Sequence, residues 1–217
     1  METELDFLTK TSTSLVLDVG ANIGQTGKML RRGGYVGRII SFEPIPYCFA
    51  KLAEAAVGDL LWDVRNVACG ETNGPARIGV SENFVSSSIL EATEGLISIH
   101  APVRYTHYEN ITMVRIDSVL PEISQLTDRI HLKIDTQGFE RHVMAGAVGA
   151  LDRIGSVRME VAVSEVYRGE MILPETITTM DHLGYILIDA WPAWRHPASG
   201  EVLHFDLLFR RKDATRS

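Results

Sequence analysis

The sequence predicts a doubly wound α/β fold, in which a mostly parallel sheet carries helices on both faces. Short apolar runs at 15–19, 38–43 and 130–135 alternate with stretches of helical periodicity. Such alternation is typical of parallel strands joined by crossover helices. Near the end, the apolar segments 185–190 and 202–209 flank a loop rich in Trp, Pro and Gly. That arrangement predicts an antiparallel hairpin at the edge of the sheet.

Length and composition favour a single globular domain, 1–217. With 217 residues, 45% of them hydrophobic, the chain can bury one substantial core. It shows no long apolar span and no export segment, and its two cysteines, Cys48 and Cys69, lie far apart. We therefore expect a cytoplasmic protein without membrane insertion. The net charge of -7 at pH 7 opposes a phosphate backbone, so we expect no nucleic-acid partner.

The first half of the chain reads as strand, glycine turn and helix, followed by the same alternation. The strand at 15–19 runs into a turn with two glycines, and a helix-like stretch follows to Arg32. After the strand at 38–43, Pro44 begins a second helix, because proline is favoured in the first turn. A third strand is predicted at about 63–68.

The region from about 71 to 128 interrupts this pattern and reads as an insertion. It contains a run of three serines, scattered aromatic residues and a strand-like segment at 112–116. We expect the insertion to cover the site where a substrate binds, because loops above strand ends set specificity. The alternation then resumes with a strand at 130–135, a helix over 139–154, a strand at 157–163 and a helix that starts near Pro174.

The first strand, its turn and the second strand carry the pattern of a nucleotide site. Asp18, Gly20, Asn22 and Gly24 form the run Asp-x-Gly-x-Asn-x-Gly, and its glycines let backbone approach a ligand. Glu43 ends the next strand about twenty residues on, where a carboxylate accepts both hydroxyls of a ribose. Together these residues predict an adenosine-type ligand.

Two classes of ligand contain such an adenosine, the dinucleotides and S-adenosylmethionine. The turn lacks the G-x-G-x-x-G spacing that a dinucleotide pyrophosphate prefers, and Asp18 suits the cationic amino and sulfonium end of S-adenosylmethionine. The third strand ends at Asn66 to Gly70, from where Asn66 and Ala68 are candidates to contact the adenine. The alternative for that segment is an ordinary exit from a strand.

At this point the chain resembles the FkbM-type methyltransferase family. The resemblance rests on residues 17–24, 42–44, 66–70 and 132–140, whose order and spacing match from about 15 to 185. The last of these, Leu-Lys-Ile-Asp-Thr-Gln-Gly-Phe-Glu, is the most distinctive.

The resemblance implies a seven-stranded Rossmann-like methyltransferase sheet, S-adenosylmethionine as cofactor, and O-methylation of a small-molecule hydroxyl. The acceptors it implies are sugars or oligosaccharides and, as the alternative, polyketide or other natural-product hydroxyls. Members of the family commonly self-associate, which makes a homo-oligomer an expectation. Arg outnumbers Lys sixteen to five, as in GC-rich genomes. An actinobacterial sugar methyltransferase, such as a mycobacterial enzyme of methylmannose polysaccharide synthesis, is one candidate.

Methyl transfer to an alcohol needs a positioned acceptor and a route for its proton. By alternation, Lys133 and Asp135 share one face of a strand, and Arg158 and Glu160 share one face of its expected neighbour. Asp135 and Glu160 are therefore candidate ligands of a Mg²⁺ that also binds the hydroxyl. Equally, Lys133 and Arg158 are suited to neutralise the two carboxylates as structural ion pairs.

Two further residues are candidates for the base. His142 follows Asp135 on the next helix, and an imidazole accepts a proton near neutral pH. Glu140 is the second candidate, although an acid at a helix N-terminus also completes a turn. Other classes of function remain open at this stage: an NAD-dependent oxidoreductase, and a non-catalytic adenosine-binding module. The acceptor wall is expected among Tyr105, His107, Tyr108, the serines 86–88, Trp191, Trp194 and His196.

Overall fold

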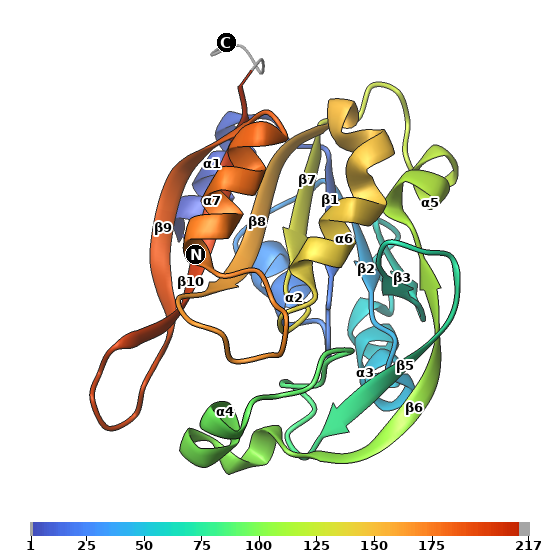
Figure 1. Cartoon of the computed structure of the whole chain (residues 1–217). Coiled ribbons are helices and arrows are strands. Elements are labelled where there is room, and N and C mark those ends of the chain that lie inside the picture. The colour runs from blue at the N-terminus through green and yellow to red at the C-terminus, as the bar shows by residue number, and fades with distance from the viewer. Residues whose placement is uncertain (1, 213–217) are drawn as a thin grey trace.

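A seven-stranded sheet with the strand order β3-β2-β1-β7-β8-β10-β9 forms the centre of the molecule (Figure 1). The structure is a computed structural model that describes residues 2–212. Strands β3, β2, β1, β7 and β8 are parallel, whereas β10 runs antiparallel to β8 and β9. The expected fold class is confirmed. The strand bounds are β1 (Leu15–Val19), β2 (Arg38–Phe42), β3 (Trp62–Arg65), β7 (Ile130–Ile134), β8 (Ile154–Ala162), β9 (Tyr185–Arg195) and β10 (Val202–Arg211).

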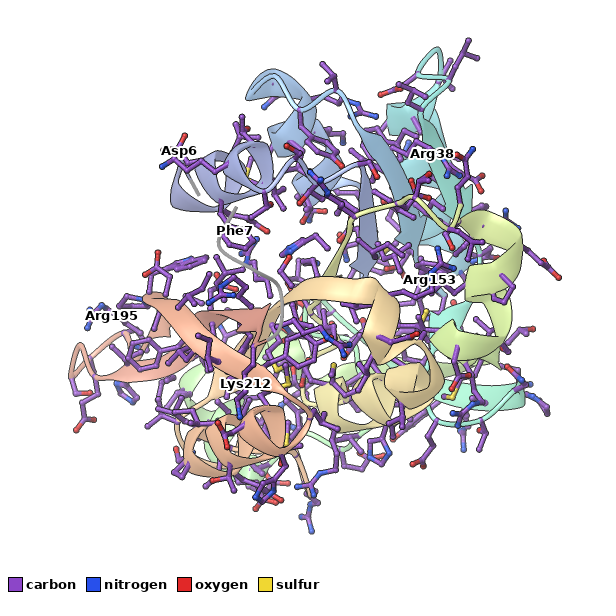
Figure 2. The ribbon with its side chains drawn as sticks, turned by 90° about the horizontal axis from the view of Figure 1, so that it is seen from above. Asp6, Phe7, Arg38, Arg153, Arg195 and Lys212 are labelled. Atoms are coloured by element: carbon purple, nitrogen blue, oxygen red, sulfur yellow. The ribbon has the colours of Figure 1, made fainter. Side chains whose placement is uncertain are left out.

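Helices cover both faces of this sheet. Figure 2 looks down from above and shows α1, with Asp6 and Phe7, on one side and α6 and α7 on the other. One buried cluster joins Leu8, Leu30 and Leu52 of the first three helices, and a larger one packs Val143 and Met180 against the opposite face. The helices are α1 (Glu2–Lys10), α2 (Gln25–Arg32), α3 (Pro46–Ala56), α5 (Ile116–Ile123), α6 (Glu140–Ala147) and α7 (Leu173–His182), with the 3-10 turn η2 (Val148–Arg153). None of the helices within residues 2–212 has the length and apolar character needed to span a membrane.

The insertion folds into a second, three-stranded sheet with the order β4-β6-β5. In Figure 1 it lies, with α4, beyond the end of the main sheet toward which the arrow of β7 points. The third main strand ends at Arg65 and not at 68, because Ala68 and Cys69 pair with β6. Likewise, the expected strand at 112–116 is the end of a longer strand, and α5 begins at Ile116. The elements are β4 (Ala68–Cys69), β5 (Gly74–Ser81), α4 (Glu94–Ile99), the 3-10 turn η1 (Ala101–Val103) and β6 (Tyr105–Val114).

A buried charge network attaches α1, a helix that the sequence pattern did not predict. The Glu4 carboxylate is 1% exposed and lies 2.7 Å from Arg158 Nη1 and 3.4 Å from His131 Nε2. Arg158 also pairs with Asp206, at 2.9 Å. Burial works to raise the pKa of Glu4, but the hydrogen bond with His131 and the charge of Arg158 hold it below its usual range. Glu4 therefore stabilises this network in its ionised form.

We expect Glu4→Gln to lower the free energy of unfolding by about 1.5–3 kcal/mol, the range for hydrogen bonds to charged groups. The loss arises because Arg158 and His131 lose a buried counter-charge. Urea unfolding at pH 7 measures it, and the difference from wild type should shrink as pH falls and Glu4 becomes protonated. Equal stability of the two proteins at pH 7 would contradict this account of α1.

Candidate active site

A cleft opens where β1, β2 and β7 end, and it holds ≈ 870 Å³ of space including its open mouth. Its walls come from the glycine turn, the strand ends, the insertion and the turn between β7 and α6. Apolar lining is supplied by Val19, Phe42, Ile45, Ala68, Cys69, Ile78, Phe84, Val85, Ile89 and Phe139. Polar lining is supplied by Asn22, Gln25, Thr26, Glu43, Ser87, Lys133, Asp135, Thr136 and Gln137.

The glycine turn packs tightly against the end of β7. Gly20 has a φ of 75°, and a Cβ there would lie 1.8 Å from the carbonyl oxygen of Asp135. Asn22 also adopts a positive φ, 47°, and lines the cleft with Gly20. Gly24 does not line it. It sits at the start of α2, where a Cβ would meet Leu52 and Trp62. Gly20 and Asn22 therefore form the wall, and Gly24 allows the turn to pack.

Glu43 is the buried carboxylate of the cleft, with 4% of the residue exposed. Its Oε2 accepts a hydrogen bond from Asn22 N at 2.9 Å, and its Oε1 accepts one from Ile45 N at 2.8 Å. Burial raises the pKa of Glu43 to about 7, against the lowering by those two N–H groups and by Lys133. Since a carboxylate offers about four acceptor positions, each oxygen keeps capacity for a ligand hydroxyl.

Asp18 lies beneath the cleft and does not line it. Its residue is completely buried, its Oδ1 lies 3.1 Å from Lys133 Nζ, and its Oδ2 accepts a hydrogen bond from Ser41 Oγ. The contact with a cationic ligand that the sequence suggested is thus taken by Lys133. A buried carboxylate needs a partner, and the chain supplies it internally.

Lys133 lines the cleft with a cationic side chain. Its Nζ donates to the carbonyl oxygen of Gly20 at 3.2 Å and lies 3.7 Å from Asp135 Oδ2. Burial works to lower the pKa of Lys133, but the charges of Asp18 and Asp135 outweigh it and raise the pKa. Lys133 therefore stays charged and ties the glycine turn to the end of β7.

Ala68 and Asn66 have different places. Ala68 and its neighbour Cys69 line the cleft. Asn66 is exposed and outside the lining, and its Nδ2 donates to the carbonyl oxygens of Glu43 and Pro44 at 2.9 and 3.0 Å. Asn66 thus fixes the turn that follows β2.

Asp135 and Glu160 do come together, because β7 and β8 are neighbours with Lys133 opposite Arg158. The group between them, however, is an amide. Gln137 Nε2 donates to Asp135 Oδ1 at 3.0 Å and to Glu160 Oε2 at 2.8 Å.

The predicted Mg²⁺ site does not fit these residues. A hydrogen-bond donor occupies the place between the two carboxylates, where an oxygen-seeking cation would need further acceptors. Within residues 2–212, no three His, Cys, Asp or Glu side chains are grouped so as to hold a metal. The alternative prediction, that Lys133 and Arg158 neutralise the two carboxylates, is correct for one pair only. Lys133 pairs with Asp135, whereas Arg158 pairs with Glu4 and Asp206. The turn that carries Gln137 back between the strands was not visible in the sequence.

Neither His142 nor Glu140 lines the cleft. The His142 ring stacks on Phe139 at 4.2 Å, and its Nδ1 lies 3.1 Å from Glu71 Oε1. Glu140 Oε1 accepts hydrogen bonds from Thr136 N and Oγ1 at 2.8 and 3.0 Å, so it completes the turn. Burial raises the pKa of Glu140 to about 7, against those turn hydrogen bonds. Phe139 and Thr136 separate the two candidates from the cleft.

The aromatic residues expected to form the acceptor wall also point elsewhere. Tyr105 donates to the Leu90 carbonyl oxygen, and Tyr108 donates to Glu91. Trp194 packs between the rings of His100 and His204. Of the three serines, Ser87 lines the cleft, together with the insertion residues Ile78, Phe84, Val85 and Ile89.

Gln137 and Tyr167 are site residues that the sequence reasoning missed. Gln137 lines the cleft, and Tyr167 is 1% exposed and donates to Gln137 Oε1 at 3.1 Å. The feature of the sequence that points to Gln137 as a site residue is its position, two residues after Asp135.

The fold and this cleft define an α/β protein of the methyltransferase class. The chain belongs to the FkbM methyltransferase family, because the family model for the methyltransferase FkbM domain matches residues 18–187. Methyltransferase sdnD of Sordaria araneosa is 27% identical over 157 residues, which cover 62% of this chain and 61% of that protein. The chain thus spans about three fifths of the length of that relative. The family assignment sets aside the NAD-dependent oxidoreductase.

Solved structures share the fold at low sequence identity. The methyltransferase domain of bacterial CtHen1-C has a TM-score of 0.54 at 8% identity, with 96% of this chain and 95% of that chain covered. TehB from Haemophilus influenzae has a TM-score of 0.53 at 12% identity, with coverage of 97% and 62%. An rRNA methylase from Streptococcus thermophilus has a TM-score of 0.51 at 9% identity, with coverage of 96% and 94%. These likenesses confirm the arrangement of the sheet.

Proposed function

We propose that this protein uses S-adenosylmethionine to methylate a hydroxyl group of a small molecule, with a sugar as the preferred acceptor class. The observation that carries the proposal is Glu43, a buried carboxylate that lines the cleft and has acceptor capacity left on both oxygens. A ribose presents two adjacent hydroxyl donors, and a carboxylate that ends the second strand is suited to accept both.

The residues of the cleft fit this cofactor. Glu43 would hold the ribose, the backbone of Gly20 and Asn22 would lie beside the amino-acid portion, and Ala68 and Cys69 would flank the adenine. The cofactor supplies an electrophilic methyl group on a sulfonium. The other requirement, removal of the hydroxyl proton, falls to Asp135, which lines the same cleft and is 40% exposed at its side chain. General-base assistance of this kind contributes about 10²- to 10⁴-fold to a rate.

A hydrogen-bonding group next to Asp135 supports a sugar acceptor. Thr136 lines the cleft directly after Asp135 in the chain, and its Oγ1, which donates to Glu140, keeps acceptor capacity for a hydroxyl group. The apolar insertion residues Ile78, Val85 and Ile89 line the cleft as well, and they favour the second candidate, a polyketide or other natural-product hydroxyl.

Self-association and a cytoplasmic location belong to the same proposal. Size-exclusion chromatography and cell fractionation test them.

Methyl transfer from labelled S-adenosylmethionine to a panel of glycosides and polyketide alcohols tests the function. We expect label in at least one hydroxylated acceptor and none in matched deoxy compounds. Thermal-shift titration provides the binding control, in which S-adenosylhomocysteine stabilises the protein and NAD does not. If S-adenosylhomocysteine binds and no acceptor is methylated, the chain is better described as an adenosine-binding module.

We expect Glu43→Gln to weaken the binding of S-adenosylhomocysteine about 10- to 100-fold, the loss that matches a hydrogen bond to a charged group. The affinity of the wild type should rise between about pH 6 and pH 8, because burial raises the pKa of Glu43 to about 7 and the ionised form is the better acceptor. Calorimetric titration at several pH values measures both effects.

The variant itself should show a flat pH dependence, since an amide does not ionise in this range. Glu122→Gln, which alters an exposed side chain on α5, is the matched control and should bind as the wild type does. Wild-type affinity in Glu43→Gln would remove Glu43 from the cofactor site.

A further inference from the structure

We propose that Gln137 is a positioning residue, which holds Asp135 in its reactive place by bridging it to Glu160. This inference rests on the proposed function, because it assigns Asp135 the acceptor's proton. It adds a specific claim, that an amide clamp built by Gln137 and Tyr167 sets the orientation of the base.

The hydrogen bonds of Gln137 reach three separate parts of the fold. Both N–H groups of Nε2 are used, one on Asp135 at the end of β7 and one on Glu160 in β8. Oε1 accepts the hydroxyl of Tyr167, which lies in the segment after β8. The same hydroxyl lies 3.1 Å from the carbonyl oxygen of Ser86 in the insertion, so its single proton is shared between these two acceptors. The donors and the acceptor of the amide are thus all engaged, which fixes its orientation.

The backbone of Gln137 is also held in an unfavourable conformation. Its φ is 56°, a left-handed value that costs free energy for a residue other than glycine and persists where surrounding contacts impose it. The carbonyl oxygen accepts Ser88 Oγ at 2.7 Å. The following Gly138 has a φ of 94°, and a Cβ there would lie 2.8 Å from Tyr167 Cβ. The turn is therefore packed onto the residue that orients the amide.

Charge explains why the clamp matters. Burial, and next the charge of Asp135, raise the pKa of Glu160, while the hydrogen bond with His204 works in the opposite direction. Lys133 approaches Asp135 from its own strand, His204 faces Glu160 from β10 at 3.5 Å, and Asp206 of β10 adds a further negative charge. Without the donors of Gln137, two neighbouring carboxylates would repel each other, and Asp135 would turn away or the pair would take up a proton.

Two variants test the clamp while keeping the turn. Gln137→Asn retains an amide and suits a left-handed φ, but its side chain is one methylene too short to reach both carboxylates. Tyr167→Phe keeps the ring and removes the hydroxyl. We expect kcat for methyl transfer to fall about 10- to 100-fold in Gln137→Asn, since small misplacements of a reacting group cost up to about 10²-fold, and less in Tyr167→Phe. Binding of S-adenosylhomocysteine should stay near wild type, and a cooperative thermal transition at a somewhat lower temperature should show that both variants fold.

The pH dependence separates positioning from a structural role. In Gln137→Asn the acidic limb of the kcat profile should move to higher pH, because Glu160, whose pKa burial and the charge of Asp135 already raise, binds a proton more readily without the amide donor that Gln137 supplies. Gln125→Asn is the matched control. It alters an exposed glutamine before the amino end of β7, opposite the end that carries the site, and should leave kcat and the profile unchanged.

Gln137→Glu gives an independent readout, because it keeps the size of the side chain and sets a third carboxylate between two others. Three carboxylates are a donor set that divalent cations prefer, so Mg²⁺ should restore part of the lost activity of this variant and leave the wild type unchanged. Wild-type kcat and pH profile in both Gln137→Asn and Gln137→Glu would overturn the clamp and leave the proposed function intact. Absence of methyl transfer by the wild type would instead overturn the proposed function.

Discussion

Asp135→Asn is expected to lower kcat for methyl transfer by about 10²- to 10⁴-fold, the contribution typical of a general base. The substitution keeps the shape of the side chain and its place beside Gln137, but an amide does not take up the proton of the acceptor hydroxyl. Single-turnover transfer from labelled S-adenosylmethionine measures the chemical step directly. The affinity for S-adenosylhomocysteine should change little, because Glu43 and the glycine turn hold the nucleoside.

The control for this experiment is Asp152→Asn, which changes an exposed carboxylate on η2 and should leave the rate unaltered. A loss of less than tenfold in Asp135→Asn would show that another group removes the proton. Neither His142 nor Glu140 lines the cleft, so such a result would redirect the search to solvent or to the acceptor itself.

Gly20→Ala is expected to cost at least about 4 kcal/mol of stability, at the upper end of single-substitution effects. The added Cβ would lie 1.8 Å from the Asp135 carbonyl oxygen, at a φ of 75° that side chains disfavour. Because that oxygen belongs to the backbone, either the glycine turn or the end of β7 must move. Urea unfolding measures the cost, and any folded fraction should bind S-adenosylhomocysteine poorly.

Gly34→Ala separates the clash from the conformational penalty. Gly34 also has a positive φ, 91°, but a Cβ there meets nothing within 4 Å. Its cost should be about 1–2 kcal/mol, the penalty for a left-handed residue. Equal costs for the two substitutions would mean that the turn and β7 are not packed as described.

The sheet could be predicted from the sequence because its signals are local. The apolar runs of β1 and β7 are buried along their whole length, so they read as short apolar segments between helical stretches. Helix α1 gave no such signal. Glu4 reads as a surface residue until His131 and Arg158, more than a hundred residues away in the chain, are placed beside it.

Site residues that lie at the end of a strand could be predicted from the sequence, whereas residues whose direction depends on a turn were harder to predict. Glu43 and Asp135 follow β2 and β7, the two parallel strands that flank β1, so their convergence on one cleft follows from topology. The inward direction of Asp18 and the fold-back of Gln137 depend on partners from other elements, Lys133 and Tyr167, which alternation does not reveal. His142 illustrates the reverse case: its helix lies beside the site, but Phe139 stands between its ring and the cleft.

A structure of the protein with bound S-adenosylhomocysteine tests the central claim most directly. We expect both ribose hydroxyls within hydrogen-bonding distance of Glu43, the homocysteine portion along the Gly20 turn, and the sulfur facing Asp135. A nucleoside bound elsewhere, or one whose ribose makes no contact with Glu43, would contradict the account.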